Sequence, residues 1–171
     1  MNEGTILIGV LALIAFVAIG VVWAVRVAWR PFRKVPLERI PRYLEMLLKR
    51  GHNGALLILT EAGSYRFLQF EKYIRQGGDQ GLCMSFPRAP WSERYYEQIK
   101  ALCLDRGVQI SETPGVSTST REFLDADLKQ DVNVAYLLVR DVFLDIFRAP
   151  TPWLVNVQTS GISARNESVT R

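Results

Sequence analysis

The feature that most constrains this chain is a run of 21 residues without a charged side chain, from Thr5 to Val25 (TILIGVLALIAFVAIGVVWAV). A helix rises about 1.5 Å per residue, so a helix of this length crosses a hydrocarbon core of roughly 30 Å. It also pairs its own backbone polar groups, as the bilayer interior requires. Signal peptides, the competing interpretation, have a basic start and a shorter apolar stretch. The sequence therefore predicts one uncleaved transmembrane helix over residues 5–25.

The charges beside this segment predict its orientation. Arg26, Arg30, Arg33 and Lys34 follow the apolar run, and no Lys or Arg precedes it. The positive-inside rule then places residues 1–4 outside and the C-terminal side in the cytoplasm, as in a bitopic protein of a bacterial inner membrane. Interfacial tryptophans and basic side chains contact lipid headgroups. The residues expected at the membrane surface are Trp23, Arg26, Trp29, Arg30, Arg33 and Lys34.

The net charge of +4 is not spread along the chain. Residues 26–50 hold eight Lys and Arg against two Glu, whereas residues 51–171 hold 13 basic and 14 acidic side chains. The basic excess therefore lies beside the membrane segment. A nearly neutral domain lacks the basic surface that nucleic-acid binding usually needs, so nucleic acid is not an expected partner.

The periodicity of residues 36–149 predicts one small α+β domain. Three helical patterns lie near residues 40–50, 93–106 and 131–146, with Gly51, Ser92 and Asp131 as capping residues. Strand patterns lie between them, bounded by Gly-rich turns. The predicted order is α-β-β-β-α-β-β-α, with about five antiparallel strands packed by three helices. Residues 26–35 read as a basic linker, and residues 150–171, rich in Ser, Thr and Asn, as a flexible tail.

No residue pattern in the sequence identifies a chemistry. The single histidine, His52, has no Cys, Asp or Glu beside it at metal-ligand spacing, and Cys83 and Cys103 lie in apolar contexts typical of free buried thiols. Phosphate-binding and nucleophile-elbow motifs are absent. The sequence therefore predicts neither a catalytic residue nor a metal or cofactor.

One acidic segment leaves an enzymatic alternative open. Asp127-Leu128-Lys129 matches the short D-x-K pattern of restriction-endonuclease-like sites, where carboxylates hold Mg²⁺. Asp125 and Asp127 would share one face of a strand, opposite Leu124. The two interpretations are a membrane-tethered metal-dependent nuclease or hydrolase that uses Asp125, Asp127 and Lys129, and a solvated strand face.

Aromatic side chains concentrate between residues 65 and 96. Ordinary packing of a sheet against helices explains many of them. A sheet with apolar side chains on both faces also fits a second face that binds a partner, or a pocket that senses a small ligand or lipid. The candidate partner-binding face consists of Tyr65, Phe67, Gln69 and Tyr73.

Two stretches carry a resemblance to a known family. Residues 65–70 (YRFLQF) are similar to the aromatic second strand of the type III secretion chaperone-like superfamily, and residues 123–128 (FLDADL) to the strand that leads into its final helix. The order of elements over residues 37–147 also resembles this superfamily, which includes tyrosine-rich chaperone-like domains. The resemblance implies a non-enzymatic domain that binds other proteins, commonly as a dimer. The membrane segment departs from the soluble chaperones and favours a fixed docking domain.

The sequence thus favours a single-pass membrane protein whose cytoplasmic domain binds a protein partner and catalyses no reaction. The expected partners are the lipid bilayer, another protein and, as the resemblance implies, a second copy of the chain.

Overall fold

The computed structural model describes residues 33–117 and 120–163. Within these residues, no helix is both long enough and apolar enough to cross a membrane. The predicted transmembrane helix lies outside them, as do four of the residues expected at the membrane surface, Trp23, Arg26, Trp29 and Arg30.

The described residues form an α+β fold, which confirms the predicted class. The elements in chain order are β1 (Arg33–Pro36), the 3₁₀ turn η1 (Leu37–Arg39), α2 (Ile40–Arg50), β2 (Gly51–Glu61), β3 (Phe67–Ile74), β4 (Gln80–Arg88), α3 (Glu93–Asp105), β5 (Gln109–Ser117), β6 (Thr120–Lys129), α4 (Val132–Asp141), the π-helical turn η2 (Val142–Ile146) and β7 (Leu154–Ile162). From α2 to α4 this order is the predicted one.

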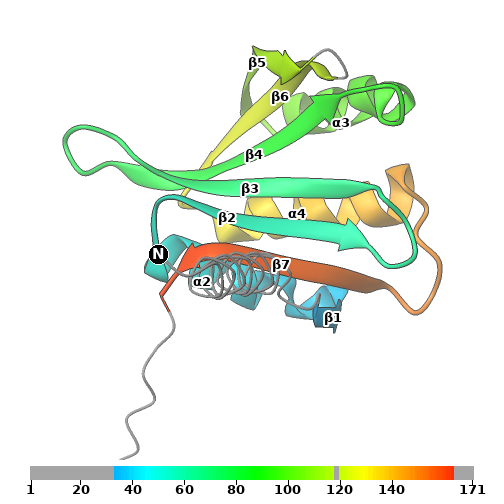
Figure 1. Ribbon diagram of the computed structural model, residues 1–171, viewed down its shortest axis with the longest axis horizontal. Coiled ribbons are helices and arrows are strands. Elements are labelled where there is room, and N and C mark those ends of the chain that lie inside the picture. The colour runs from blue at the N-terminus through cyan, green and yellow to red at the C-terminus, as the bar shows by residue number, and fades with distance from the viewer. Residues whose placement is uncertain (1–32, 118–119, 164–171) are drawn as a thin grey trace, which may run out of the picture. The chain divides into compact units, whose positions relative to one another are not determined.

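All strand pairs in the sheet are antiparallel, in the order β1-β7-β2-β3-β4-β6-β5. The helices α2 and α4 lie behind the sheet in the view of Figure 1. The four-residue β1 and the longer β5 form the two edges. One face of the sheet is therefore packed by helices, and the described residues place no helix on the other.

The alternation of side chains along the strands explains this two-layer arrangement. In β2, Leu57 and Leu59 are fully buried, whereas Leu56 and Ile58, at the alternating positions, are half-buried on the opposite face. The helices supply the other half of the core. Leu44 and Leu47 of α2, Tyr96 and Ile99 of α3, and Leu138 and Val139 of α4 are all fully buried. Only one face of each strand contributes to this core.

The helix ends agree with the sequence in part. The Asp131 carboxylate caps α4, because it accepts hydrogen bonds from the backbone N–H groups of Asn133 and Val134 at 3.0 and 2.9 Å. Ser92 stands at the N-cap position of α3, but its hydroxyl donates to the carbonyl of Pro87 instead. Ser92 therefore fixes the turn between β4 and α3 rather than capping the helix.

The prediction of about five strands was wrong, and so was the prediction of a flexible tail over residues 154–162, whereas residues 164–171 of that tail lie outside the described residues. Leu154–Ile162 form β7, which lies between β1 and β2 in the sheet, and the end of the expected linker forms β1. Val155 is paired with Val35 on one side and Glu61 on the other, and is almost fully buried. The polar composition of residues 151–171 suggested a loop, whereas the two neighbouring strand edges satisfy the β7 backbone.

This placement makes β7 essential for folding. We expect Val155→Asp to prevent folding of the domain or to lower its melting temperature severely, because it places an unpaired carboxylate in the core. Gln158→Asp, on the opposite face of the same strand, is the control and is expected to change the free energy of unfolding by less than about 1 kcal/mol. Circular dichroism melting of both variants checks this. Equal stability of the two would contradict the burial of β7.

Candidate functional site

The candidate site is the face of the sheet that the described helices leave uncovered, here called the open face. Its side chains come from alternate positions of adjacent strands, so that Ile58 pairs with Gln69 and Thr60 with Phe67 across β2 and β3. Three of the predicted partner-binding residues, Phe67, Gln69 and Tyr73, lie on this face and are half-buried. Tyr65 lies just before β3 and is 70% exposed.

A hollow on the open face lies over β3, β4, β6 and β5. It has a volume of about 520 Å³. The register of the strands explains which side chains meet there, because Ser85 pairs with both Gln69 and Asp125, and Cys83 with both Glu71 and Asp127. Most of the residues that line the hollow are therefore polar or charged. They are Glu71, Tyr73, Arg75, Cys83, Ser85, Gln109, Ile110, Ser111, Asp125 and Asp127.

Asp127 is held by three donors. The Tyr73 hydroxyl donates to Oδ1 at 2.7 Å, the Lys129 backbone N–H donates to the same atom at 3.0 Å, and the Arg75 guanidinium donates to Oδ2 at 2.9 Å. Burial would raise the pKa of Asp127, but these hydrogen bonds outweigh it and lower the pKa below its usual value. For Tyr73 the two effects act in the same direction, because burial and the bond to Asp127 both raise its pKa, to about 12.

Tyr73 also explains a glycine on the neighbouring strand. It pairs with Gly81 on β4, and a Cβ at Gly81 would overlap the Tyr73 ring and the carbonyl of Lys129. The ring therefore lies over the glycine, an arrangement that stabilises a weak strand position. The Arg75 guanidinium lies 4.4 Å from the centre of the Tyr73 ring. The acidic end of the hollow is thus a fixed network.

The other aspartate of the hollow is also hydrogen-bonded, and the thiol of the hollow has a raised pKa. Asp125 accepts hydrogen bonds from the Ser85 hydroxyl at 2.6 Å and from the Thr113 hydroxyl at 2.7 Å, one on each of its oxygens. Burial, together with the nearby charge of Asp125, raises the pKa of the Cys83 thiol to about 11. A thiol with that pKa is protonated at neutral pH and is a poor nucleophile.

These contacts weigh against the hydrolase hypothesis. The structure confirms that Asp125 and Asp127 share one strand face opposite the buried Leu124. However, each of their four carboxylate oxygens already accepts a hydrogen bond. Among the described residues, no three His, Cys, Asp or Glu side chains lie close enough to hold a metal ion. Lys129 is exposed, and so is His52, whose Nδ1 contacts the Asn53 carbonyl.

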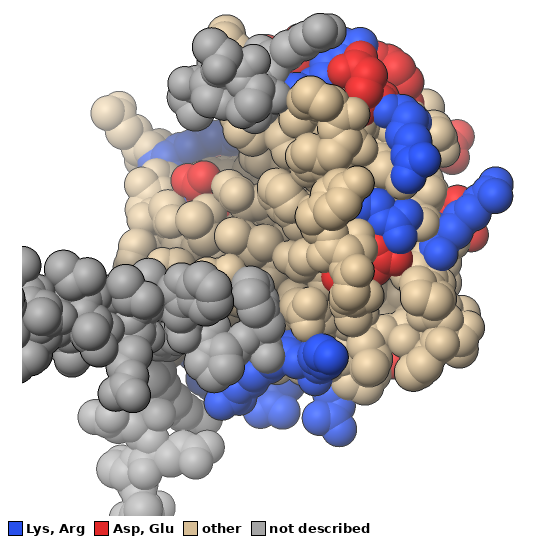
Figure 2. All heavy atoms as spheres, turned by 45° about the vertical axis from the view of Figure 1, so that its right-hand side comes forward, with Lys and Arg blue, Asp and Glu red and all other residues tan. Residues whose placement is uncertain are grey.

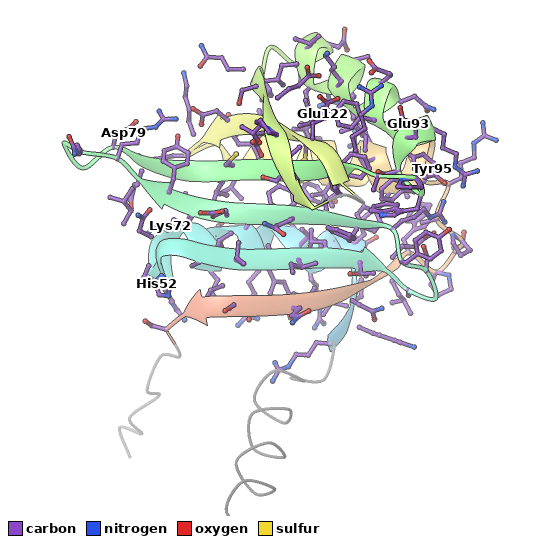
Figure 3. All side chains as sticks on the ribbon, turned by 45° about the horizontal axis from the view of Figure 1, so that its top comes forward. His52, Lys72, Asp79, Glu93, Tyr95 and Glu122 are labelled. Atoms are coloured by element: carbon purple, nitrogen blue, oxygen red, sulfur yellow. The ribbon has the colours of Figure 1, made fainter. Side chains whose placement is uncertain are left out.

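An aromatic cluster lies at one end of the open face. The Trp91 ring packs against Phe67 at a centroid distance of 5.3 Å, against Phe86 at 5.8 Å and edge-on against Tyr65 at 5.9 Å. Figure 3 shows Tyr95 at this end, close to Glu93, and Asp79 at the other end of the sheet. Sequence reasoning did not select Trp91, because a tryptophan between a strand and a helix carries no periodic signal.

A buried ion pair fixes the loop beside this cluster. Glu61 is 1% exposed, and Arg66 donates to its Oε2 from Nε and to its Oε1 from Nη2, both at 2.5 Å. Arg66 also donates to the carbonyl of Phe147. These bonds tie the turn between β2 and β3 to the end of η2. Burial would lower the pKa of Arg66, but its hydrogen bonds to Tyr95 and Glu61 outweigh this and raise its pKa above the ordinary value.

The two remaining residues expected at the membrane surface, Arg33 and Lys34, are exposed in β1, at one edge of the sheet. No protein-family model, no curated protein and no solved structure was found to match the chain. The resemblance to secretion chaperones therefore stays a prediction.

The Asp127 network predicts a defined pH dependence. Its lowered pKa in the folded state stabilises the fold above the unfolded pKa of about 3.9, and this contribution is lost as the pH falls through the folded value. We expect Asp127→Asn to lower the free energy of unfolding by about 1–3 kcal/mol at pH 7, since it removes a charged acceptor.

Urea unfolding at pH 7, 5 and 3 checks this, and the gap from the unmodified protein should narrow toward pH 3. Glu45→Gln is the control, because that carboxylate is exposed and, among the described residues, pairs only with the exposed Lys49 one turn away. A gap that stays constant with pH would show that the Asp127 charge contributes nothing.

Proposed function

We propose that this chain is a single-pass membrane protein whose α+β domain docks a protein partner on its open face and performs no catalysis. The domain lies in the cytoplasm in this proposal, because the basic residues follow the apolar segment. The proposed partner is a protein, and a second copy of the chain is one of the outcomes that the experiment below distinguishes.

The observation that carries the proposal is the composition of the open face. An antiparallel sheet with one face in solvent normally alternates apolar and polar positions, with the polar ones outward. Here the outward positions include half-buried apolar and aromatic side chains on β2, β3, β6 and β7. A face of this kind, which no helix of the described residues covers, is typical of a surface that another protein covers. The residues are Leu56, Ile58, Phe67, Tyr73, Phe123 and Leu154.

The state of the polar groups supports a binding role rather than a catalytic one. Asp125 and Asp127 have their oxygens occupied by neighbours, and the thiols of Cys83 and Cys103 have raised pKa values of about 11 and about 12 because of burial. No activated nucleophile or base lies among these groups. The fixed positions of Asp125 and Asp127 give the open face a defined shape, which lowers the entropy cost of binding.

The short connection to the predicted span supports a fixed position at the membrane. Residues 26–32 separate the apolar run from β1, and seven residues span at most about 25 Å when fully extended. A domain held so close to the bilayer cannot act as a soluble shuttle. It would instead gather its partner at the membrane.

The membrane assignment has a direct test. We expect the full chain to stay in the membrane pellet after alkaline carbonate extraction, and a variant without residues 5–25 to appear in the supernatant, because it lacks the apolar run. A chain with these residues replaced by an unrelated apolar span is the control and should stay in the pellet. Release of the full chain by carbonate would contradict the anchor.

Site-specific photo-crosslinking tests the docking face. A photoreactive amino acid at Ile58 on the open face is compared with one at Leu104, which is 56% exposed on α3. We expect the full-length protein in its native membrane to form a discrete adduct with one partner from Ile58 and none from Leu104. Mass spectrometry of the adduct identifies the partner.

A matched pair of substitutions completes this experiment. Ile58→Lys should abolish capture of the partner from gently solubilised membranes, since it places a charge in the apolar face. Leu104→Lys should leave capture unchanged. Equal crosslinking from both positions, or capture that survives Ile58→Lys, would overturn the docking proposal. An adduct of the chain with itself would identify the partner as a second copy.

A further inference from the structure

Two adjoining hollows lie at the aromatic end of the domain. Each has a volume of about 280 Å³, and they share Arg66, Arg94 and Tyr95. The first, here called the aromatic hollow, is also lined by Tyr65 and Trp91. The second, here called the arginine hollow, is also lined by Gln98, Asp145, Ile146, Phe147 and Arg148.

The aromatic hollow continues the open face. Phe67 is an open-face residue, and its ring lies 5.3 Å from that of Trp91, which in turn holds Tyr65 edge-on at 5.9 Å. Tyr65 is 70% exposed, so one of its faces is available to a ligand. A partner that covers Phe67 would therefore also reach Trp91 and Tyr65.

The arginine hollow carries unbalanced positive charge. Glu61 neutralises Arg66. Among the residues that the structure describes, no carboxylate lies within ion-pair distance of Arg94 or Arg148, and Asp145 is the only acidic group in the lining. The Arg94 guanidinium lies 4.5 Å from the centre of the Tyr95 ring and donates to the Tyr95 hydroxyl. Arg94 is thus held in place while its charge stays available.

Arg148 adds an independent observation. Its backbone has a φ of +54°, in the left-handed region that favours glycine. An arginine at such a position costs stability relative to glycine, so the backbone does not explain the presence of this side chain. A role in binding does, because Arg148 lines the arginine hollow.

We propose that these two hollows bind an acidic segment of the partner protein, with a carboxylate on Arg94 and Arg148 and a neighbouring aromatic side chain against Trp91 and Tyr65. This inference rests on the proposed docking function and specifies the chemistry of the partner. Trp, Tyr and Arg are the residue types that dominate binding energy at protein interfaces, and this end of the domain presents all three. Figure 2, which brings this end forward, shows uncharged surface with charged side chains mostly around it.

Defined peptides test the chemistry of this binding directly, whatever the identity of the partner. The probe is a fluorescent peptide Gly-Asp-Glu-Trp-Asp-Phe-Gly, and the control peptide carries Asn and Gln in place of Asp and Glu. With the full-length protein in detergent, we expect the acidic peptide to bind at least tenfold more tightly than the control peptide. Its affinity should fall with rising salt, because exposed charges are screened.

Four variants, one of them a control, assign this binding to the hollows. Arg94→Glu and Arg148→Glu should each weaken the acidic peptide at least tenfold, whereas Arg42→Glu, the same charge change on the exposed part of α2, should change it less than twofold. Arg148→Gly should also weaken binding but leave the melting temperature unchanged or higher, because glycine accepts a positive φ. If Arg148 were instead needed for the fold, Arg148→Gly would lower the melting temperature.

The outcomes separate this inference from the docking function. If the partner is still crosslinked from Ile58 but neither the peptide nor the partner responds to Arg94→Glu and Arg148→Glu, the acidic-segment inference is wrong and the docking function stands. If the peptide binds as expected but no partner is crosslinked from Ile58, the docking face is wrong while the anion-binding hollows remain. Equal affinity for the acidic and neutral peptides overturns the inference directly.

Discussion

The pairing of β7 with both β1 and β2 is the interaction on which the rest of the domain depends. β7 joins the first described strand to the body of the sheet, and its Val155 and Val157 are buried among the residues of the core. Without it, β2 would lose the hydrogen-bond partners of one edge and β1 would have no neighbour. The sheet is therefore completed only when the end of the described chain has returned to its beginning. Such non-local pairing makes folding slower than the local helices alone would allow.

The charged groups of the domain differ between the open face and the aromatic end. On the open face the carboxylates Asp125 and Asp127 are bound by hydroxyl, guanidinium and backbone donors. At the aromatic end, by contrast, Arg94 and Arg148 have no carboxylate partner among the described residues. The two aspartates of the open face are thus used within the fold, whereas the positive charges of Arg94 and Arg148 stay available for a ligand. This asymmetry is the reason that an acidic partner segment fits the proposed docking function.

The sequence predicted the elements that local patterns encode. The apolar spacing of α4 and its Asp131 cap, and the alternation of Leu124, Asp125 and Ala126 on β6, are visible in a short window and were confirmed. It did not predict β1 and β7, whose backbone bonds come from distant strands, or the Arg66–Glu61 pair, whose partners meet only when the turn after β2 closes. Trp91, although it lies in the aromatic-rich stretch, was not assigned to the partner-binding face for a related reason. Its neighbours Phe67 and Phe86 belong to two different strands, so only the fold brings the three rings together.

The two edges of the sheet have a consequence for copies of the chain held together on one membrane, as the proposed function has them. Proteins confined to a surface meet more often than proteins in solution, and an exposed strand edge is a template for polymerisation. Here β1 has only four residues and ends in Pro36, and β5 carries Pro114, next to an irregularity in its pairing with β6. Proline lacks the N–H that an added strand would need. The prolines on both edges therefore oppose the fusion of sheets from neighbouring copies into a continuous fibre.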